Sequence, residues 1–222
     1  MADTLVNKFA SQGSANTATN ITDSIGADER LTILSVSICN TATANDLHFK
    51  LWVDPASGDD AYIYDTQPLP AKSTFIHNTK IVLLEGDVLK FAPTDHQVAN
   101  VIVSALKQTA QSASEENLSR TLLVSANAAS DALMTPNNTT AVKTILGFTI
   151  CNTDASDATT FDVQVRNSGG TEFYLYQDQA LPSRSTFEHS DKIVLVANEE
   201  LVFTGGASSL PTSVICSYLL QP

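Results

Sequence analysis

A stretch of fifteen residues that occurs twice constrains this chain more than any other feature of its sequence. It runs from Leu69 to Leu83 and returns 112 positions later, from Leu181 to Leu195. Ten residues are identical in register, including one Pro, one Phe and one His. Such internal similarity identifies a tandem duplication, so each half of the chain has to be interpreted against the other.

The same offset relates segments on both sides of this stretch. Upstream, residues 32–34 match residues 144–146; downstream, we align residues 102–103 with residues 214–215 and place no gap between. Two copies of this length are too few and too long for a solenoid. They predict two domains of about 100 residues each.

Each copy has the pattern of short β-strands. Apolar and polar residues alternate from Leu47 to Val53 and again from Phe161 to Val165, and Gly-containing turns separate such segments. We expect about seven or eight antiparallel strands per copy. The fold class is therefore predicted to be all-β, with two tandem, similar antiparallel β-sandwich domains of a jelly-roll-like kind.

We divide the chain into four segments. Residues 1–28 are polar and of low complexity, which predicts a flexible or extended N-terminal arm with at most one short strand near Ile21. Residues 29–107 form the first domain, residues 108–120 a linker rich in Gln, Ser, Ala and Glu, and residues 121–222 the second domain. The first strand of the second domain is expected within residues 121–136.

Composition narrows the classes of function. The chain has 12 basic and 24 acidic residues, a net charge of −12, and phosphate backbones would repel it, so we expect no nucleic-acid partner. The N-terminus lacks the apolar core of a signal peptide, and no run reaches the length of a spanning helix, so we expect no membrane partner and folding in the compartment of synthesis. The three cysteines include no Cys-x-x-Cys pair, which suggests neither a disulfide framework nor a zinc site.

Several residue pairs could carry chemistry, and each also has a structural interpretation. His77 and His189 occupy equivalent positions, but no carboxylate or cysteine accompanies both at ligand spacing. A hydrogen bond in a turn or an interface is favoured over a ligand or a general base. Cys39 and Cys151 are also equivalent and lie in mid-strand, where a small buried residue is favoured over a reactive thiol. We aligned Cys216 with Ser104 on the same interpretation.

Three carboxylates, Asp54, Asp59 and Asp60, surround a turn at Gly58 and could hold Ca²⁺ through their oxygens. The second copy retains one carboxylate at these positions, so a solvated hairpin tip is favoured. We therefore expect no metal, no cofactor and no catalytic site, and the protein is predicted not to be an enzyme.

Aromatic residues give the remaining candidates. Trp52 lies on the polar side of its strand, where it could contact a glycan or a protein partner, although partial burial under a loop is favoured. The aromatic strands recur in both halves. We assign a possible interface role to Trp52, both histidines and the four tyrosines Tyr62, Tyr64, Tyr174 and Tyr176.

With the repeat laid out, each half resembles the small β-domains of structural proteins in tailed-phage virions. The likeness rests on four elements in each half. In the first half they are Asn40-Thr41, Pro70-Ala71-Lys72-Ser73, Gly86-Asp87 and Ser104-Ala105-Leu106. In the second half they are Asn152-Thr153, Pro182-Ser183-Arg184-Ser185, Asn198-Glu199 and Ser217-Tyr218-Leu219. The departures from the family pattern are Ala105 for Tyr and Asn198-Glu199 for Gly-Asp.

The resemblance implies a structural component of a virion: a capsid decoration, neck or tail protein. Its expected partners are copies of itself, as a trimer or ring, and other virion proteins such as the major capsid or connector protein. Its expected location is the virion, after assembly in the host cytoplasm. A carbohydrate-binding module or adhesin, with Trp52 and the tyrosines as its platform, is the alternative.

Overall fold

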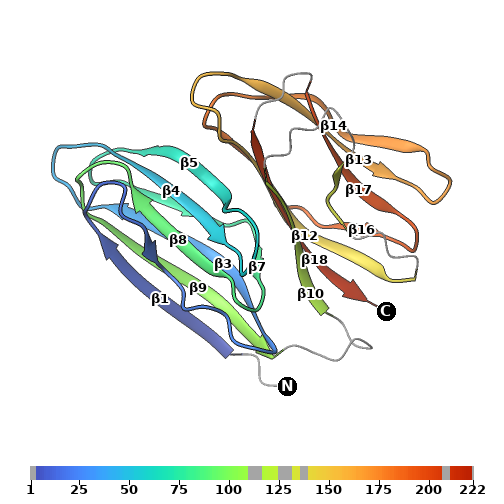
Figure 1. The fold of residues 1–222 in the computed structure, drawn as a ribbon, viewed down its shortest axis with the longest axis horizontal. Helices are drawn as coiled ribbons and strands as arrows, with labels where there is room; N and C mark the ends of the chain where they lie inside the picture. Colours follow the sequence, from blue (N-terminus) through green and yellow to red (C-terminus); the bar gives the residue numbers. More distant parts are fainter. Residues whose placement is uncertain (1–3, 110–116, 125–131, 136–139, 207–210, 222) are drawn as a thin grey trace. The chain divides into compact units, whose positions relative to one another are not determined.

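A computed structural model describes residues 4–109, 117–124, 132–135, 140–206 and 211–221 (Figure 1). None of these residues is helical, so no described helix could cross a membrane. All of the sheets are antiparallel, and the predicted all-β fold class is confirmed. The chain divides into two compact units, Met1–Ala110 and Gln111–Pro222, which we call unit 1 and unit 2.

Unit 1 contains nine strands within the described residues: β1 (Thr4–Gln12), β2 (Thr19–Asn20), β3 (Glu29–Asn40), β4 (Leu47–Asp54), β5 (Ala61–Leu69), β6 (Thr74–His77), β7 (Ile81–Leu83), β8 (Val88–Pro93) and β9 (Ala99–Thr109). One sheet has the order β1-β9-β3-β6, with β7 also paired to β3. The other sheet has the order β2-β8-β4-β5. Consecutive strands therefore often change sheet, and the apolar side chains of the two sheets meet in one core.

Unit 2 also contains nine strands within the described residues: β10 (Asn117–Val124), β11 (Ala132–Leu133), β12 (Val142–Asn152), β13 (Thr159–Arg166), β14 (Glu172–Leu181), β15 (Thr186–His189), β16 (Ile193–Leu195), β17 (Glu200–Gly205) and β18 (Thr212–Gln221). Its sheets have the orders β10-β18-β12-β15, with β16 paired to β12, and β11-β17-β13-β14. These orders correspond strand by strand to those of unit 1.

The alternation in the sequence accounts for the layers. In β4, Phe49, Leu51 and Val53 are fully buried, and Phe161 and Val163 are buried at the equivalent positions of β13. Because side chains on a strand alternate in direction, each strand of this kind presents one apolar face to the core. Aromatic rings then join the sheets: Phe49 of β4 lies 5.4 Å, between ring centroids, from Phe75 of β6.

The N-terminal segment differs from our prediction. Residues 1–28 do not form a separate arm where they are described: β1 pairs with β9 over nine positions, from Thr4 with Lys107 to Gln12 with Ala99. β2 pairs with β8, and Ile21 is 4% exposed. Alternate residues of β1, from Val6 to Gln12, lie partly buried against the sheet, and the residues between them, including Leu5 and Phe9, face solvent. The expected linker, 108–120, likewise overlaps the end of β9 and the start of β10.

The gapless alignment holds for β3 and β12 but is wrong at the downstream end of the repeat. Ile33 pairs with Ala105, whereas Ile145, which is 112 residues after Ile33, pairs with Tyr218. The last strands are therefore offset by 113 residues, so Cys216 corresponds to Val103 and not to Ser104. The additional residue falls between β17 and β18. A loop can accept one residue, whereas an insertion within a strand would turn its side chains to the opposite face.

Candidate assembly surface and the predicted site residues

The two histidines of the repeated stretch hold the two sheets of each unit together. Nδ1 of His77, on β6, shares a 2.9 Å hydrogen bond with the hydroxyl of Tyr64, on β5 of the other sheet. Nδ1 of His189 and the hydroxyl of Tyr176 share the same bond at the same distance. Burial lowers the pKa of His189, with an opposing contribution from Asp191. Each histidine therefore bonds across the two sheets of its own unit, and not in a turn or at an interface as the sequence suggested.

A bulge separates the tyrosines that the sequence pattern put on one side of a strand. Trp52 pairs with Tyr62 and Leu51 pairs with Tyr64, so Ile63 is an extra residue between them. The extra residue turns Tyr64 into the core, where it is 3% exposed, while Tyr62 stays beside Trp52 on the outer side. Unit 2 repeats this bulge at Leu175, between Tyr174 and Tyr176.

The predicted interface residues therefore fall into two groups. Tyr64, His77 and Trp52 are at most 6% exposed and His189 is 7% exposed, so these four side chains present little surface to a partner. Tyr62 and Tyr176 are partly buried. Tyr174 is 53% exposed and is the clear surface aromatic of the set.

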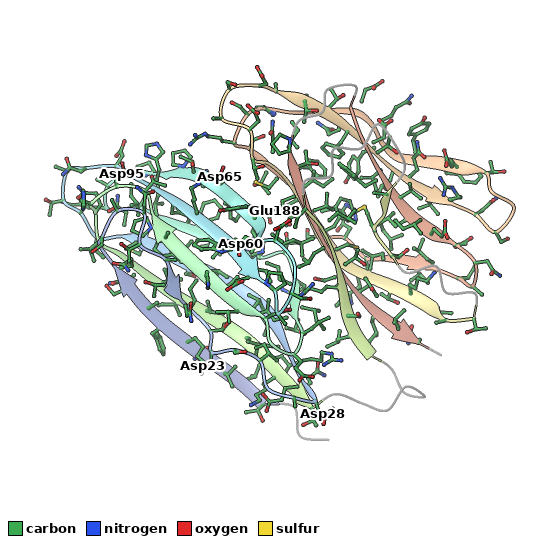
Figure 2. The ribbon with its side chains drawn as sticks, viewed as in Figure 1. Asp23, Asp28, Asp60, Asp65, Asp95 and Glu188 are labelled. Atoms are coloured by element: carbon green, nitrogen blue, oxygen red, sulfur yellow. The ribbon has the colours of Figure 1, made fainter. Side chains whose placement is uncertain are left out.

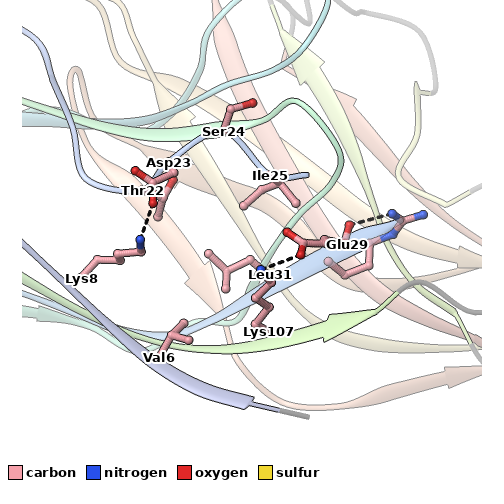
Figure 3. A pocket seen from close by; sticks show the side chains of 10 residues that line it. Val6, Lys8, Thr22, Asp23, Ser24, Ile25, Glu29, Leu31 and Lys107 are labelled. Atoms are coloured by element: carbon pink, nitrogen blue, oxygen red, sulfur yellow. Dashed lines mark hydrogen bonds and ion pairs between the residues drawn. The ribbon is translucent and has the colours of Figure 1, made fainter. Parts of the chain in front are cut away.

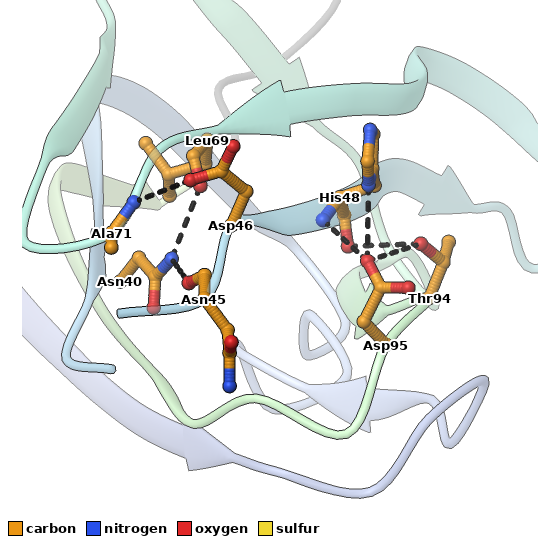
Figure 4. A network of polar contacts seen from close by, with 8 residues as sticks. All are labelled: Asn40, Asn45, Asp46, His48, Leu69, Ala71, Thr94 and Asp95. Carbon is orange, nitrogen blue, oxygen red and sulfur yellow. Dashed lines mark hydrogen bonds and ion pairs between the residues drawn. The ribbon is translucent and has the colours of Figure 1, made fainter. Parts of the chain in front are cut away.

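The Asn-Thr and Pro-x-x-Ser motifs of the repeat lie together at one end of each sandwich, and Figure 4 shows part of this end in unit 1. The buried amide of Asn40 donates hydrogen bonds to the carbonyl oxygens of Asn45 (3.0 Å) and Leu69 (3.1 Å). The amide of Asn152 donates to the carbonyl oxygens of Asp157 (2.9 Å) and Leu181 (3.2 Å). The threonine that follows each asparagine, Thr41 or Thr153, and the serine of each Pro-x-x-Ser turn donate hydrogen bonds to main-chain carbonyl oxygens. The carboxylate of Asp87, or of Glu199 in unit 2, accepts a hydrogen bond from a main-chain N–H. These motifs are therefore structural.

The Gly-Asp turn and its counterpart need a left-handed backbone. Gly86 has φ +81°, and a Cβ built there would lie 2.4 Å from the Cβ of Ala56. Asn198 adopts φ 64° at the equivalent position, which asparagine tolerates better than most residues. The departure from Gly in the second copy thus leaves the turn intact.

Of the three carboxylates at the Gly58 turn, Asp54 takes part in an ion pair. Asp54 pairs with Lys90 at 2.5 Å, and burial together with the charge of Asp54 raises the pKa of Asp60. At the same place unit 2 pairs Arg166 with Glu172 at 2.6 Å. Among the residues that the structure describes, no three His, Cys, Asp or Glu side chains gather as a metal site would require.

The cysteines are free thiols: Cys39 is half-buried, and Cys151 and Cys216 are buried. Burial raises the pKa of Cys216 well above the ordinary thiol range. The reactive thiolate form of Cys216 is therefore disfavoured, which agrees with the prediction of a small, inert core residue.

A cavity of about 180 Å³ lies beside β1 (Figure 3). Four of its charged residues form pairs: Lys8 binds Asp23, and Lys107 binds Glu29 at 2.6 Å. These partners lower the pKa of Asp23 and of Glu29. A fifth charged residue of the lining, Arg30, donates a 2.9 Å hydrogen bond to the main-chain oxygen of Glu29.

The outer side of the first sheet of unit 1 is a different kind of surface, which we call the uncharged face. Its outward side chains are Leu5, Asn7, Phe9, Ser11, Ser35, Ser37, Cys39, Thr74, Ile76, Asn100, Ile102, Ser104 and Leu106. Phe9 and Ile102 are directly opposite each other and are 71% and 45% exposed. Arg30 lies beyond one end of the face, and the labelled carboxylates Asp23, Asp28 and Asp95 lie in loops (Figure 2).

Sequence reasoning missed this surface. The residues of β1 were assigned to an arm, and the outward residues of β9 were not considered as a face. The repeat itself contains a signal for β1. The first strand of the second domain is predicted within residues 121–136, and the offset of 112 places its counterpart in the first copy from residue 9 onward. Phe9 would then have appeared on a strand with Leu5 on the same side.

No protein-family model matches the chain, and no curated protein matches it. Similar solved structures include the major capsid protein P2 of bacteriophage PM2, at 11% identity and TM-score 0.40, covering 99% of this chain and 97% of that one. The tandem CBM22 domains of Paenibacillus barcinonensis Xyn10C are also similar, at 11% identity and TM-score 0.29, covering 99% and 93%. The PBSX exported protein XepA is 9% identical with TM-score 0.26, covering 92% and 86%. These TM-scores are too low for the likenesses to bear on function.

Proposed function

We propose that this protein is a structural component of a phage virion that acts by protein–protein assembly and is not an enzyme. The observation that carries the proposal is the uncharged face of unit 1. A wide sheet surface without a charged side chain is unexpected on a chain with a net charge of −12. Depletion of charge and exposed apolar residues are features of interface cores.

The proposed partners are other copies of the chain, in a trimer or ring, and virion proteins such as the major capsid or connector protein. Nucleic acid and membranes are not proposed as partners, because the acidic surface would be repelled by phosphate. The proposed place of action is the virion, as capsid decoration, neck or tail protein, after assembly in the host cytoplasm.

The alternative, a carbohydrate-binding module or adhesin, has one observation in its favour. Trp52 and Tyr62 lie side by side with ring centroids 5.9 Å apart, and Nζ of Lys50 lies 5.5 Å from the centre of the Tyr62 ring. Against it, Trp52 is only 6% exposed, and sugar platforms need accessible ring faces. We therefore rank this function second.

Antibody labelling tests the proposal. Antibodies against the purified chain should label particles from the source organism at fixed positions in negative-stain images, and peptides of the chain should be present in those particles at constant stoichiometry. Absence of the chain from particles, together with glycan binding that is lost on Trp52→Ala, would favour the alternative. Retention of the label after high-salt washing distinguishes a built-in component from an adsorbed one.

A further inference from the structure

We propose that the uncharged face of unit 1 binds strand β14 of a second copy of this chain, head to tail. The inference rests on the proposed assembly function and names the surfaces that carry it. One surface belongs to unit 1 and the other to unit 2, so each copy can bind two others.

The uncharged face has the chemistry of one side of a sheet-to-sheet contact. Its exposed apolar side chains include Leu5 and Phe9 of β1, Ile102 of β9 and Ile76 of β6, and small polar residues of β3 lie between them. Apolar side chains of a partner can interdigitate with those of such a face, as they do where one sheet packs on another. Leu5 and Phe9 are 75% and 71% exposed, so both side chains are largely open to water.

Strand β14 supplies the second surface. It is the last strand in the order β11-β17-β13-β14 and therefore an edge strand. Three consecutive large apolar residues are exposed on it: Phe173 by 57%, Tyr174 by 53% and Leu175 by 37%. Exposed apolar edge strands are regular sites of association.

Charge favours a second copy as the occupant. Two chains of net charge −12 repel each other, so they can approach most closely where unpaired carboxylates are fewest. The uncharged face has none, and on β14 Glu172, next to Phe173, is neutralised by Arg166 at 2.6 Å, while Asp178 lies beyond the apolar residues. The equivalent face of unit 2 is less suitable, because Arg120 and Glu188 stand where unit 1 has Asn7 and Ile76. Of the two equivalent faces, the one in unit 1 is therefore the one without a charged side chain.

The head-to-tail arrangement follows from the presence of two different surfaces on each copy. A face-to-face dimer through unit 1 would leave Phe173 and Tyr174 in water, and a dimer through β14 would leave Phe9 and Ile102 in water. A head-to-tail contact covers both surfaces in every copy. Contacts of this heterologous kind close into rings when the rotation permits.

The test uses full-length chains with one carboxylate added to each surface. Ile102→Glu blocks the uncharged face and Tyr174→Glu blocks β14. Val194→Glu, at a strand position that is 60% exposed and belongs to neither surface, is the matched control. Circular dichroism and thermal unfolding verify that each variant is folded.

Sedimentation velocity measures the outcome. The wild-type chain and Val194→Glu should associate alike, whereas each blocking variant alone should bind at least about 100-fold more weakly, because a buried unpaired carboxylate is strongly unfavourable. An equimolar mixture of the two blocking variants should form a one-to-one pair, since each retains the surface that the other lacks.

A mixture that stays monomeric while the wild type associates would overturn the head-to-tail contact but leave the assembly function standing. Association of the blocking variants at wild-type strength would overturn the choice of surfaces. A wild-type chain that is monomeric at every concentration would overturn self-association, whereas the virion role is decided separately by particle labelling.

Discussion

At the scale of single residues, the asparagine of each repeat is the clearest structural determinant. Asn40 is fully buried, and its amide donates hydrogen bonds to two main-chain carbonyl oxygens, that of Asn45 in the loop after β3 and that of Leu69 at the end of β5. Asn40→Ala leaves both acceptors without that donor, so we expect the free energy of unfolding to fall by about 2–4 kcal/mol. Urea denaturation measures the change. Asn45→Ala, at an exposed neighbouring position, is the control and should change stability by less than about 0.5 kcal/mol. Equal effects of the two substitutions would contradict the assignment.

A second residue-scale prediction concerns pH. Burial lowers the pKa of His189 below its ordinary value of 6.5, so folded unit 2 binds fewer protons than the unfolded chain near that pH. The contribution of His189 to stability is therefore present above pH 6.5 and is lost as the pH falls through the folded pKa. His189→Gln should make urea stability less dependent on pH between about pH 5 and pH 7. His96→Gln, at an exposed position, should leave the slope unchanged, and a slope that is the same in all three chains would contradict the prediction.

At the scale of elements, β1 and β2 are integral parts of the two sheets of unit 1. A chain that begins at Ala27 lacks both strands and also Ile21 and Ile25, which are 4% and 9% exposed. Burial of each such side chain is worth about 1.5–3 kcal/mol, so unit 1 should be strongly destabilised. Hydrogen exchange of the β9 amides, from Ala99 to Thr109, reports this directly. A chain that begins at Thr4 retains β1 and should exchange like the full chain; equal protection in the Ala27 chain would mean that the N-terminal strands are dispensable.

At the scale of the whole molecule, net charge opposes assembly. Copies with a charge of −12 repel over about 10 Å at 0.1 M salt and about 3 Å at 1 M. If uncharged surfaces hold the copies together, their association should strengthen as sodium chloride rises over this range. Sedimentation equilibrium of the wild-type chain measures it, and Val194→Glu should give a parallel salt dependence. Association that weakens with salt would instead show that attractive ion pairs drive it.

Some features of the fold were accessible from the sequence because they depend on neighbours along the chain. Alternation marked β4 and β13, and glycines at Gly58 and Gly170, both with positive φ, marked hairpin turns. The segment of β1 was missed because its outward apolar residues, Leu5 and Phe9, alternate with polar ones next to a polar, low-complexity stretch, and local composition then resembles that of a disordered terminus. The pairing with β9, almost a hundred residues later, is what makes it a strand.

The sequence by itself determined that the chain is a duplicated all-β protein, since the repeat, the alternation and the turns are all local or periodic signals. Only the tertiary structure decided which aromatic residues face the core. A single bulged residue, Ile63, turns Tyr64 inward toward His77 and leaves Tyr62 outside, and no periodic pattern reveals a bulge before the partner strand is known. The uncharged face is likewise a property of strand order, because Phe9 and Ile102 become neighbours only when β1 pairs with β9.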